Sequence, residues 1–131
     1  MPVRILLYED NEVMRDSLSA LLLQSDDHVL CGAFDNCSGI EKQVAHLQPD
    51  VILMDIEMPE CDGLEAARRI RAFEAQSGIE RIPILALTAS ALGDDRSQCL
   101  AAGMDAYLTK PFDRQDLEEA IQKLLHRANA A

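Results

Sequence analysis

Short apolar runs alternate along the chain with longer segments whose apolar residues recur every three or four positions. The runs are rich in β-branched residues or leucine and predict strands, whereas the longer segments predict helices. The predicted strands cover residues 5–8, 29–34, 51–54, 84–88 and 106–109. Five strand–helix alternations are typical of an α/β fold. We therefore expect a doubly wound parallel sheet with helices on both faces.

Each of the five predicted helices has an apolar stripe. The expected stripes are Val13, Met14, Leu18, Leu21 and Leu22; Ile40, Val44 and Leu47; Leu64, Ala67, Ile70 and Phe73; Cys99 and Leu100; and Leu117, Ile121, Leu124 and Leu125. Residues 38–41 have the pattern of a capping box, and Asp62 and Asp113 are suitable N-caps. Gly78 and Gly103 are expected to end the third and fourth helices. The fourth has the thinnest apolar face and should be the least anchored.

The chain of 131 residues fits one domain, which we expect to cover residues 1–131 without an output domain. It carries 12 Lys and Arg against 23 Asp and Glu, a net charge of −11. Such an acidic surface repels phosphate backbones and anionic lipid, so neither nucleic acid nor a membrane is an expected partner. The arginine-rich stretch 68–71 is best interpreted as a solvated helix face, with a docking patch as the alternative.

The apolar runs are too short for a signal peptide or a membrane span. The four cysteines form no C-x-x-C pair, which favours free thiols in a reducing compartment. They are Cys31, Cys37, Cys61 and Cys99. We therefore expect a cytoplasmic protein.

Polar residues follow four of the predicted strands. Glu9 and Asp10 come after the first strand, Asp55 ends the third, Thr88 ends the fourth and Lys110 follows the fifth. In a parallel sheet these carboxyl ends share one edge, which is where ligands bind. Three carboxylates brought together repel one another unless a cation neutralises them. Hard oxygen ligands suit Mg²⁺, or Mn²⁺, and not zinc.

This set of residues indicates phosphoryl transfer, which needs mainly positioning and neutralisation of charge. Lys110 and Thr88 supply a counter-charge and a hydrogen-bond donor for phosphoryl oxygens. A carboxylate nucleophile would form an aspartyl phosphate, and Asp55 is the central candidate because it ends the middle strand. Each residue alone also has an ordinary structural explanation, such as a helix N-cap for Asp10. The combination is what points to a site.

Four stretches of the chain resemble the receiver domain of two-component response regulators, over essentially its whole length. They are residues 5–11, 50–59 with 62–63, 83–89 and 103–112. The resemblance implies a CheY-like, flavodoxin-like fold with five strands in the order 2-1-3-4-5 and five helices. Residues 86–112 resemble the receivers of hybrid histidine kinases.

By this resemblance Asp55 is the phospho-acceptor, Thr88 and Lys110 hold the phosphoryl group, and Thr88 and Tyr107 form the switch. The Lys110–Pro111 peptide bond is expected to be cis, which an X–Pro bond tolerates. The implied Mg²⁺ ligands are Glu9, Asp10, Asp55 and the backbone carbonyl of Glu57.

Three positions depart from the family pattern. Glu9 stands where aspartate is most common, Tyr8 where an aliphatic residue is usual, and Cys61 in the loop after Asp55. These differences bear on metal affinity and on the lifetime of the phosphoryl group. They remove no essential group.

The resemblance implies that a histidine kinase or a histidine-phosphotransfer protein donates the phosphoryl group. The domain then catalyses only its own phosphorylation and dephosphorylation. The fourth helix, fifth strand and fifth helix form the responsive face, through which a homodimer could form.

Three alternative functions fit the sequence less well. A phosphohydrolase with an aspartate nucleophile would carry D-x-D-x-T, whereas residues 55–59 read Asp-Ile-Glu-Met-Pro. A flavodoxin-type protein would need a phosphate loop after the first strand, where Glu9 and Asp10 stand instead. A receiver that serves only as an unphosphorylated adaptor normally lacks one of the site groups, and none is missing here.

Overall fold

The computed structural model describes residues 2–24, 26–58, 62–89 and 93–129, along which strands and helices alternate. The strands are β1 (Val3–Tyr8), β2 (His28–Phe34), β3 (Val51–Asp55), β4 (Ile84–Thr88) and β5 (Ala106–Thr109). The helices are α1 (Glu12–Leu23), α2 (Ile40–Leu47), α3 (Gly63–Ser77), α4 (Gly93–Ala101) and α5 (Arg114–Asn129). All five predicted strands are confirmed, with one or two extra residues at one end of β1, β2 and β3. Within the described part of the chain, no helix is both long and apolar enough to cross a bilayer.

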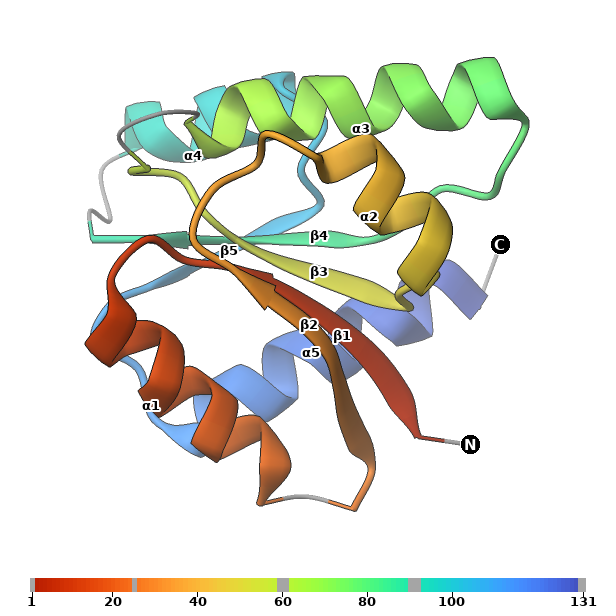
Figure 1. Cartoon of the computed structure of the whole chain (residues 1–131). Helices are drawn as coiled ribbons and strands as arrows, with labels where there is room; N and C mark the ends of the chain where they lie inside the picture. Colours follow the sequence, from red (N-terminus) through yellow and green to blue (C-terminus); the bar gives the residue numbers. More distant parts are fainter. Residues whose placement is uncertain (1, 25, 59–61, 90–92, 130–131) are drawn as a thin grey trace.

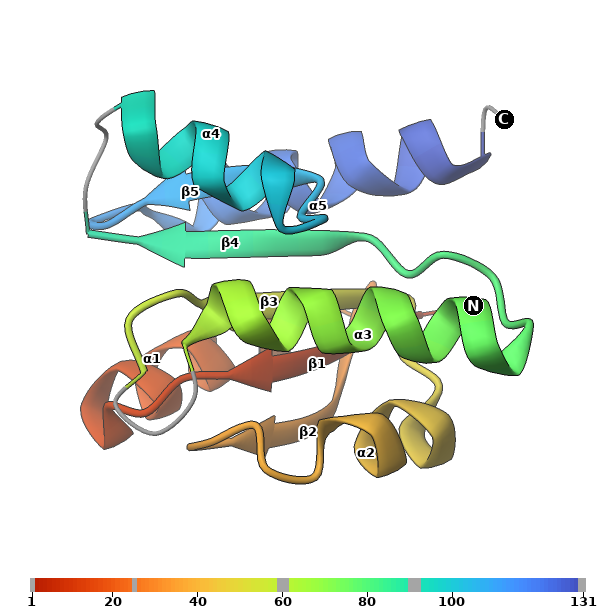
Figure 2. The same ribbon diagram turned by 90° about the horizontal axis from the view of Figure 1, so that it is seen from above.

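The strands form one parallel sheet in the order β2-β1-β3-β4-β5. Helices α1 and α5 cover one face of the sheet, and α2, α3 and α4 cover the other (Figure 1). Seen from above, α2, α3 and α4 lie side by side across the sheet (Figure 2). The doubly wound fold is therefore confirmed. The winding direction reverses between β1 and β3, and the crevice at their carboxyl ends is the usual ligand site of such sheets.

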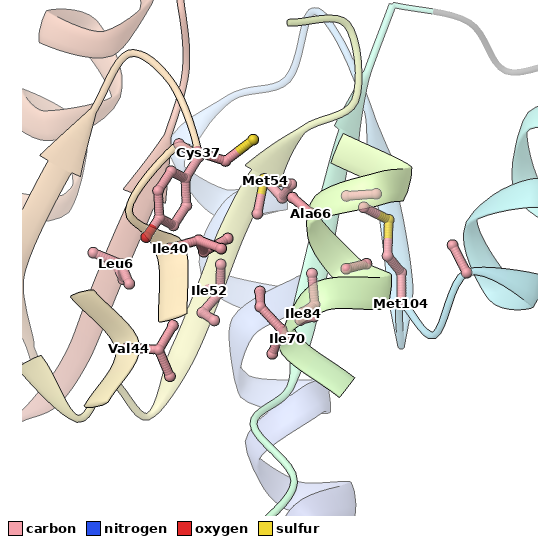
Figure 3. Packing of buried hydrophobic residues seen from close by; sticks show 14 of the residues in the cluster. Leu6, Cys37, Ile40, Val44, Ile52, Met54, Ala66, Ile70, Ile84 and Met104 are labelled. Atoms are coloured by element: carbon pink, nitrogen blue, oxygen red, sulfur yellow. The ribbon is translucent and has the colours of Figure 1, made fainter. Parts of the chain in front are cut away.

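Successive residues of the three inner strands face opposite sides of the sheet and enter two hydrophobic clusters. On the side of α2, α3 and α4, the strands contribute Leu6, Tyr8, Ile52, Met54, Ile84 and Ala86 (Figure 3). On the side of α1 and α5, they contribute Ile5, Leu7, Val51, Leu53, Leu85 and Leu87. All twelve are buried, as expected for parallel strands covered on both faces. This burial holds the strands in register and so fixes the positions of the residues that follow them.

Three of the predicted helix ends are confirmed by hydrogen bonds or backbone angles. The Asp62 carboxylate accepts the N–H of Glu65 at 2.7 Å, and the Asp113 carboxylate accepts the N–H of Asp116 at 2.8 Å. These bonds satisfy amide groups that have no partner inside the helix. Gly78 ends α3 with a φ of 71°, the left-handed conformation that glycine adopts without a steric cost.

The capping box predicted over residues 38–41 is wrong. The helix α2 begins only at the third of these residues, and no side chain caps its first turn. The Ser38 hydroxyl donates instead to the side chain of Asn36 at 2.7 Å. Glu41 pairs with Arg69 on α3. The Ser38 hydroxyl and the Glu41 carboxylate thus bind other partners in place of the backbone N–H groups that a capping box would satisfy.

Two residues of the predicted apolar stripes face solvent. Val13 is 75% exposed and Leu100 is 52% exposed. Helix α1 is held by Leu18 and Leu22, which are buried. Among the described side chains of α4, Cys99 is the buried one, so the apolar face of α4 is even thinner than predicted. Few buried groups therefore oppose a movement of α4.

The interpretation of residues 68–71 as a solvated face holds only for Arg68, whose side chain is 57% exposed. Arg69 donates to both carboxylate oxygens of Glu41, at 2.6 and 2.7 Å. This bidentate ion pair joins α3 to α2. A partner 28 residues away in sequence leaves no local signal of its presence.

Arg71 is also directed inward. Its guanidinium donates to the carboxylate of Glu74 at 2.8 Å and to that of Asp105 at 2.8 Å. It also donates to the carbonyls of Ile82 at 2.9 Å and of Gly103 at 2.8 Å. Arg71 therefore ties α3 to the segments that enter β4 and β5, which corrects the prediction of a solvated side chain.

The cysteines do not all follow the prediction. Cys31 and Cys99 are not disulfide-bonded, as expected. Cys37 is disulfide-bonded, so the prediction of a free thiol is wrong for this residue. Cys61 lies outside the described residues. The spacing of cysteines along a sequence does not report the separation of their Cβ atoms in space, which decides whether a bond can form.

The edge strand β2 carries a bulge. Ile5 of β1 pairs with Leu30, and the next residue, Leu6, pairs with Gly32. Cys31 is therefore the extra residue of β2, and its thiol lies 3.3 Å from the carbonyl oxygen of Ile5. Such a bulge bends and twists the strand locally.

Candidate functional site

The predicted polar residues meet at the carboxyl edge of the sheet. Strand β3 lies between β1 and β4, so Asp55 at its end is flanked by Glu9 after β1 and by Thr88 at the end of β4. Glu9, Asp55 and Thr88 are all buried. The site is thus built into the end of the core, where water screens charges poorly.

Backbone and side-chain contacts hold the segment between β1 and α1. The Glu9 N–H donates to the carbonyl of Phe34 at 3.0 Å, and the guanidinium of Arg15 donates to the Glu9 carbonyl at 3.0 Å. The side chain of Asn11 caps α1. Asp10 is therefore placed between two anchored residues. No sequence pattern indicates the role of Arg15, because its partner is a backbone group.

The segment after β3 depends on a glycine. A Cβ atom at Gly63 would lie 2.7 Å from the carbonyl oxygen of Asp55 and 2.7 Å from the Cα atom of Ile56. Only glycine lets α3 begin this close to the strand that carries the central acid. The Asp55 side chain itself accepts the N–H of Glu57 at 3.0 Å. The sequence motif contained Gly63, but its steric role was not predicted.

Lys110 reaches the acids from β5. Its backbone N–H donates to the Thr88 carbonyl at 2.7 Å. Its ammonium group lies 2.8 Å from Oε1 of Glu9 and 3.7 Å from Oδ1 of Asp55. One half-buried cation thus serves two carboxylates that lie 46 positions apart along the chain.

The three acids can hold a metal ion. Glu9, Asp10 and Asp55 each offer a carboxylate oxygen, and these atoms all lie within 4.8 Å of one another. A set made only of oxygen donors fits a hard divalent cation. Asp10 is half-buried, which leaves the cluster a side that solvent can reach.

The two buried acids titrate differently. Burial, and then the hydrogen bond with Asp55, raises the pKa of Glu9 to about 7. Burial also opposes ionisation of Asp55. Hydrogen bonds from Glu9 and from the Glu57 N–H, together with the positive charge of Lys110, outweigh burial and lower the pKa of Asp55. The pair therefore keeps its proton on Glu9 and leaves Asp55 ionised. An ionised carboxylate is the form that can act as a nucleophile.

A comparison with known families agrees with this geometry. The model of the response regulator receiver domain matches residues 5–122. The chain belongs to this family. Receiver domains are signalling switches and not enzymes in the usual sense. Neither the phosphohydrolase nor the adaptor alternative finds support among the relatives.

Histidine kinases are among the relatives of this receiver domain in sequence. It is 36% identical over 138 residues to "Probable histidine kinase 4" of Oryza sativa subsp. japonica, covering 92% of this chain and 14% of that protein. It is 38% identical over 125 residues to "Hybrid signal transduction histidine kinase G" of Dictyostelium discoideum, covering 92% of this chain and 4% of that protein. The chain thus spans a small part of the relatives it matches.

Two of the solved structures that are similar to this receiver domain bear on its site. One is the receiver domain of the sensor histidine kinase PA1611 from Pseudomonas aeruginosa, with a magnesium ion coordinated in its active-site cleft. It has a TM-score of 0.77 and 39% identity, with 96% of this chain and 99% of that chain covered. The other is the receiver domain of Ssk1 in complex with the histidine phosphotransfer protein Ypd1 of Saccharomyces cerevisiae. It has a TM-score of 0.85 and 28% identity, with 94% of this chain and 88% of that chain covered.

The remaining predicted residues of the receiver domain have defined positions. The side chain of Glu57 is exposed. Tyr107 on β5 is half-buried and packs against the hydrophobic cluster on the side of α2, α3 and α4. The peptide bond between Lys110 and Pro111 is cis, as expected. Of the segment between β4 and α4, residues 90–92 lie outside the described part.

Proposed function

We propose that Asp55 accepts a phosphoryl group from a phosphohistidine on a histidine kinase or a histidine-phosphotransfer protein. The observation that carries this proposal is the buried Asp55 carboxylate at the end of β3, with the ammonium group of Lys110 3.7 Å from its Oδ1. Two relatives point the same way, because one is part of a sensor histidine kinase and the other was solved bound to a phosphotransfer protein.

In the proposed reaction an Asp55 carboxylate oxygen attacks the phosphorus atom. The new O–P bond forms as the N–P bond breaks, and the electron pair of that bond stays on the imidazole nitrogen of the donor. Lys110 neutralises charge on the phosphoryl oxygens, and the Thr88 hydroxyl donates a hydrogen bond to one of them. Placing groups in this way supplies most of what phosphoryl transfer requires.

The acidic cluster fits Mg²⁺, or Mn²⁺, as the cofactor. Glu9, Asp10 and Asp55 would hold the ion, because their carboxylate oxygens already lie close together. The backbone carbonyl of Glu57 would be a further ligand. A bound ion supplies positive charge to the phosphoryl oxygens. Mg²⁺ is commonly held by one or two carboxylates and by phosphate oxygens, which matches such a site.

The phosphoryl group would then act as a local switch. It adds about two negative charges next to Thr88 and Lys110, and we propose that Thr88 moves toward them and that Tyr107 repacks. The face of α4, β5 and α5 would change in response. A groove between β5 and α5, lined by Tyr107, Leu108 and residues of α5, offers this face to a partner or to a second copy of the domain.

Labelling with acetyl phosphate tests the proposal. With Mg²⁺ and acetyl phosphate, intact-mass spectrometry should show one added phosphoryl group, and Asp55→Asn should abolish it. The matched control is Asp16→Asn on the exposed surface of α1, which should be labelled like the unmodified protein. Labelling that persists in Asp55→Asn would refute Asp55 as the acceptor.

A further inference from the structure

The buried side chains that hold helix α4, among those that the structure describes, lie at its carboxyl end. Cys99 in the last turn of α4, and Ala102 and Met104 just after it, are buried. All three belong to the hydrophobic cluster on the side of α2, α3 and α4. The other described side chains of α4 are exposed. Packing in the described part of the chain therefore fixes the end of α4 that leads into β5.

Backbone hydrogen bonds close α4 at the same end. The Gly103 N–H donates to the carbonyl of Leu100 at 3.1 Å, and the Met104 N–H donates to that of Cys99 at 2.9 Å. Gly103 has a φ of 101°, the left-handed conformation that this helix ending requires. A Cβ atom at Gly103 would lie 2.8 Å from Cγ of Arg71, so only glycine lets the arginine pass this close to the helix end.

Two arginines hold the carbonyl group of Gly103. Nε of Arg71 donates to it at 2.8 Å, and Nη2 of Arg81 donates to it at 3.2 Å. The Arg71 side chain is largely shielded, and its guanidinium is itself held by Glu74 on α3 and by Asp105 before β5. A movement of Gly103 would therefore break hydrogen bonds of a charged group that has little access to water, which is costly.

Arg71 ties the end of α4 to the amino end of the sheet. Asp105 and Ile84, the first residue of β4, exchange two hydrogen bonds. The Ile84 N–H donates to the Asp105 carboxylate at 2.9 Å, and the Asp105 N–H donates to the Ile84 carbonyl at 3.0 Å. The carboxyl end of α4, helix α3 and the starts of β4 and β5 are thus joined in one unit, at the edge of the sheet opposite Asp55.

The amino end of α4 lies toward the edge that carries Asp55. Strand β4 ends at Thr88 and α4 begins at Gly93, so the chain enters α4 from that edge. Figure 2 shows α4 starting above the carboxyl end of β4 and running back toward the start of this strand. Its nine residues make the helix about 14 Å long. A displacement that starts at Thr88 therefore enters α4 one helix length away from Gly103.

Resting on the phosphoryl switch proposed above, we propose that Arg71 fixes the carboxyl end of α4, so that the helix turns about Gly103 and its amino end carries the displacement when Asp55 is phosphorylated. Arg71 lies at the edge of the sheet opposite the acceptor, so it is a positioning residue for the switch. A partner that distinguishes the two states has to contact the amino half of α4, because the carboxyl half stays in place.

Nuclear magnetic resonance of the unmodified protein tests the pivot directly. After phosphorylation with acetyl phosphate and Mg²⁺, residual dipolar couplings of the α4 amides should report a change in the direction of the helix axis. The correlation through the hydrogen bond from Arg71 Nε to the carbonyl carbon of Gly103 should persist in the same sample. An axis that keeps its direction would overturn the proposal, and so would loss of the correlation on phosphorylation.

The Arg71→Met variant tests the role of the guanidinium. The Ala102 and Met104 amides report on the carboxyl end of α4, because they donate to the carbonyls of Gln98 and Cys99. In the unmodified protein, phosphorylation should leave their hydrogen-exchange rates unchanged. In Arg71→Met, phosphorylation should raise both rates at least about tenfold, because the displacement then reaches this end of the helix. Comparing the two states of one variant removes the effect of the substitution on the resting fold, and rates that ignore phosphorylation in Arg71→Met would overturn the proposal.

Two other arginine variants complete the test. The matched control is Arg68→Met, which removes an exposed guanidinium from the same helix and should respond like the unmodified protein. If Arg71→Met fails to fold, Arg81→Met removes the more exposed donor to Gly103, and phosphorylation should raise the exchange rate of the Met104 amide about threefold. An unchanged rate in Arg81→Met would contradict the role of the two arginines.

The pivot and the proposed function fail separately. If acetyl phosphate does not label Asp55, the function fails, and relaxation dispersion of the resting protein tests the pivot. Exchange is then expected at the amides of residues 93–97 and not at those of residues 102–104, and dispersion of equal size at both ends would overturn the pivot. If labelling succeeds and the bond between Arg71 and Gly103 breaks, only the pivot fails.

Discussion

Arg71 and Asp105 form an ion pair, with Nη2 and Oδ2 2.8 Å apart, that joins α3 to the turn before β5. Both side chains are largely shielded, at 15% and 22% exposed. The same Asp105 oxygen accepts the N–H of Ile84, the first residue of β4, at 2.9 Å. The pair therefore closes the amino end of the sheet, opposite the acidic site.

Breaking this pair should destabilise the domain. We expect Asp105→Asn to lower the free energy of unfolding by about 2 kcal/mol, because Arg71 keeps a shielded charge with one partner fewer. Urea denaturation measures the change. The control is Arg68→Gln, which removes an exposed pair with Glu65 and should cost less than about 0.5 kcal/mol. Equal losses in the two variants would contradict this account.

Gly63→Ala should disturb both the fold and the site. Its Cβ would lie 2.7 Å from two backbone atoms, so β3 or α3 has to shift, and we expect a loss of about 2 kcal/mol in the free energy of unfolding. Labelling by acetyl phosphate should also slow, because Asp55 is one of the displaced residues. In the control Gly39→Ala, the new Cβ meets only the flexible side chain of Gln43, at 3.5 Å. A Gly63→Ala protein as stable as this control would argue against the steric role.

The pKa of Glu9 near 7 makes stability depend on pH. In the unfolded chain Glu9 titrates near 4.5, whereas burial holds its proton in the folded domain up to about pH 7. Its stabilising contribution is therefore complete below pH 4.5 and is lost as the pH rises to 7, by up to about 3 kcal/mol. Urea denaturation with metal chelated, from pH 4.5 to 8, measures this loss. Glu9→Gln should lack it, and identical pH profiles for the two proteins would refute the assignment.

Thr88→Ala separates chemistry from switching. The variant keeps Asp55 and Lys110, so acetyl phosphate should still label it. It lacks the Thr88 hydroxyl that would move toward the phosphoryl group. We expect the amide shifts of β5 and α4 on phosphorylation to fall to less than about half of those in the unmodified protein, on the view that the switch is a biased two-state equilibrium. Thr109→Ala on the neighbouring strand β5 is the control and should respond fully. An undiminished response in Thr88→Ala would refute the coupling.

The strands and the meeting of the acids could be predicted because both follow from periodicity. Continuous apolar runs identify the buried parallel strands, and in a parallel sheet the residues after them share one edge. Glu9, Asp55 and Lys110 therefore came together as expected, although 101 positions separate the first from the last.

The errors arose where a distant partner overrides a local pattern. Glu41 was expected to cap its own helix but pairs with Arg69 on another. Arg71 was expected in solvent but contacts segments that follow β3 in the chain. Val13 fits a helical stripe by spacing, yet no neighbouring element covers it. Spacing along the chain reports the period of a helix and not which groups the tertiary fold brings against it.

The bulge at Cys31 has a consequence for self-association. An outer strand with a regular row of free amide and carbonyl groups can template the addition of another chain, whereas a twisted strand cannot pair along its length. Here one border of the sheet is bulged and the other, β5, has only four residues. Neither border favours intermolecular strand pairing, so the native domain should tolerate crowding without seeding fibrils.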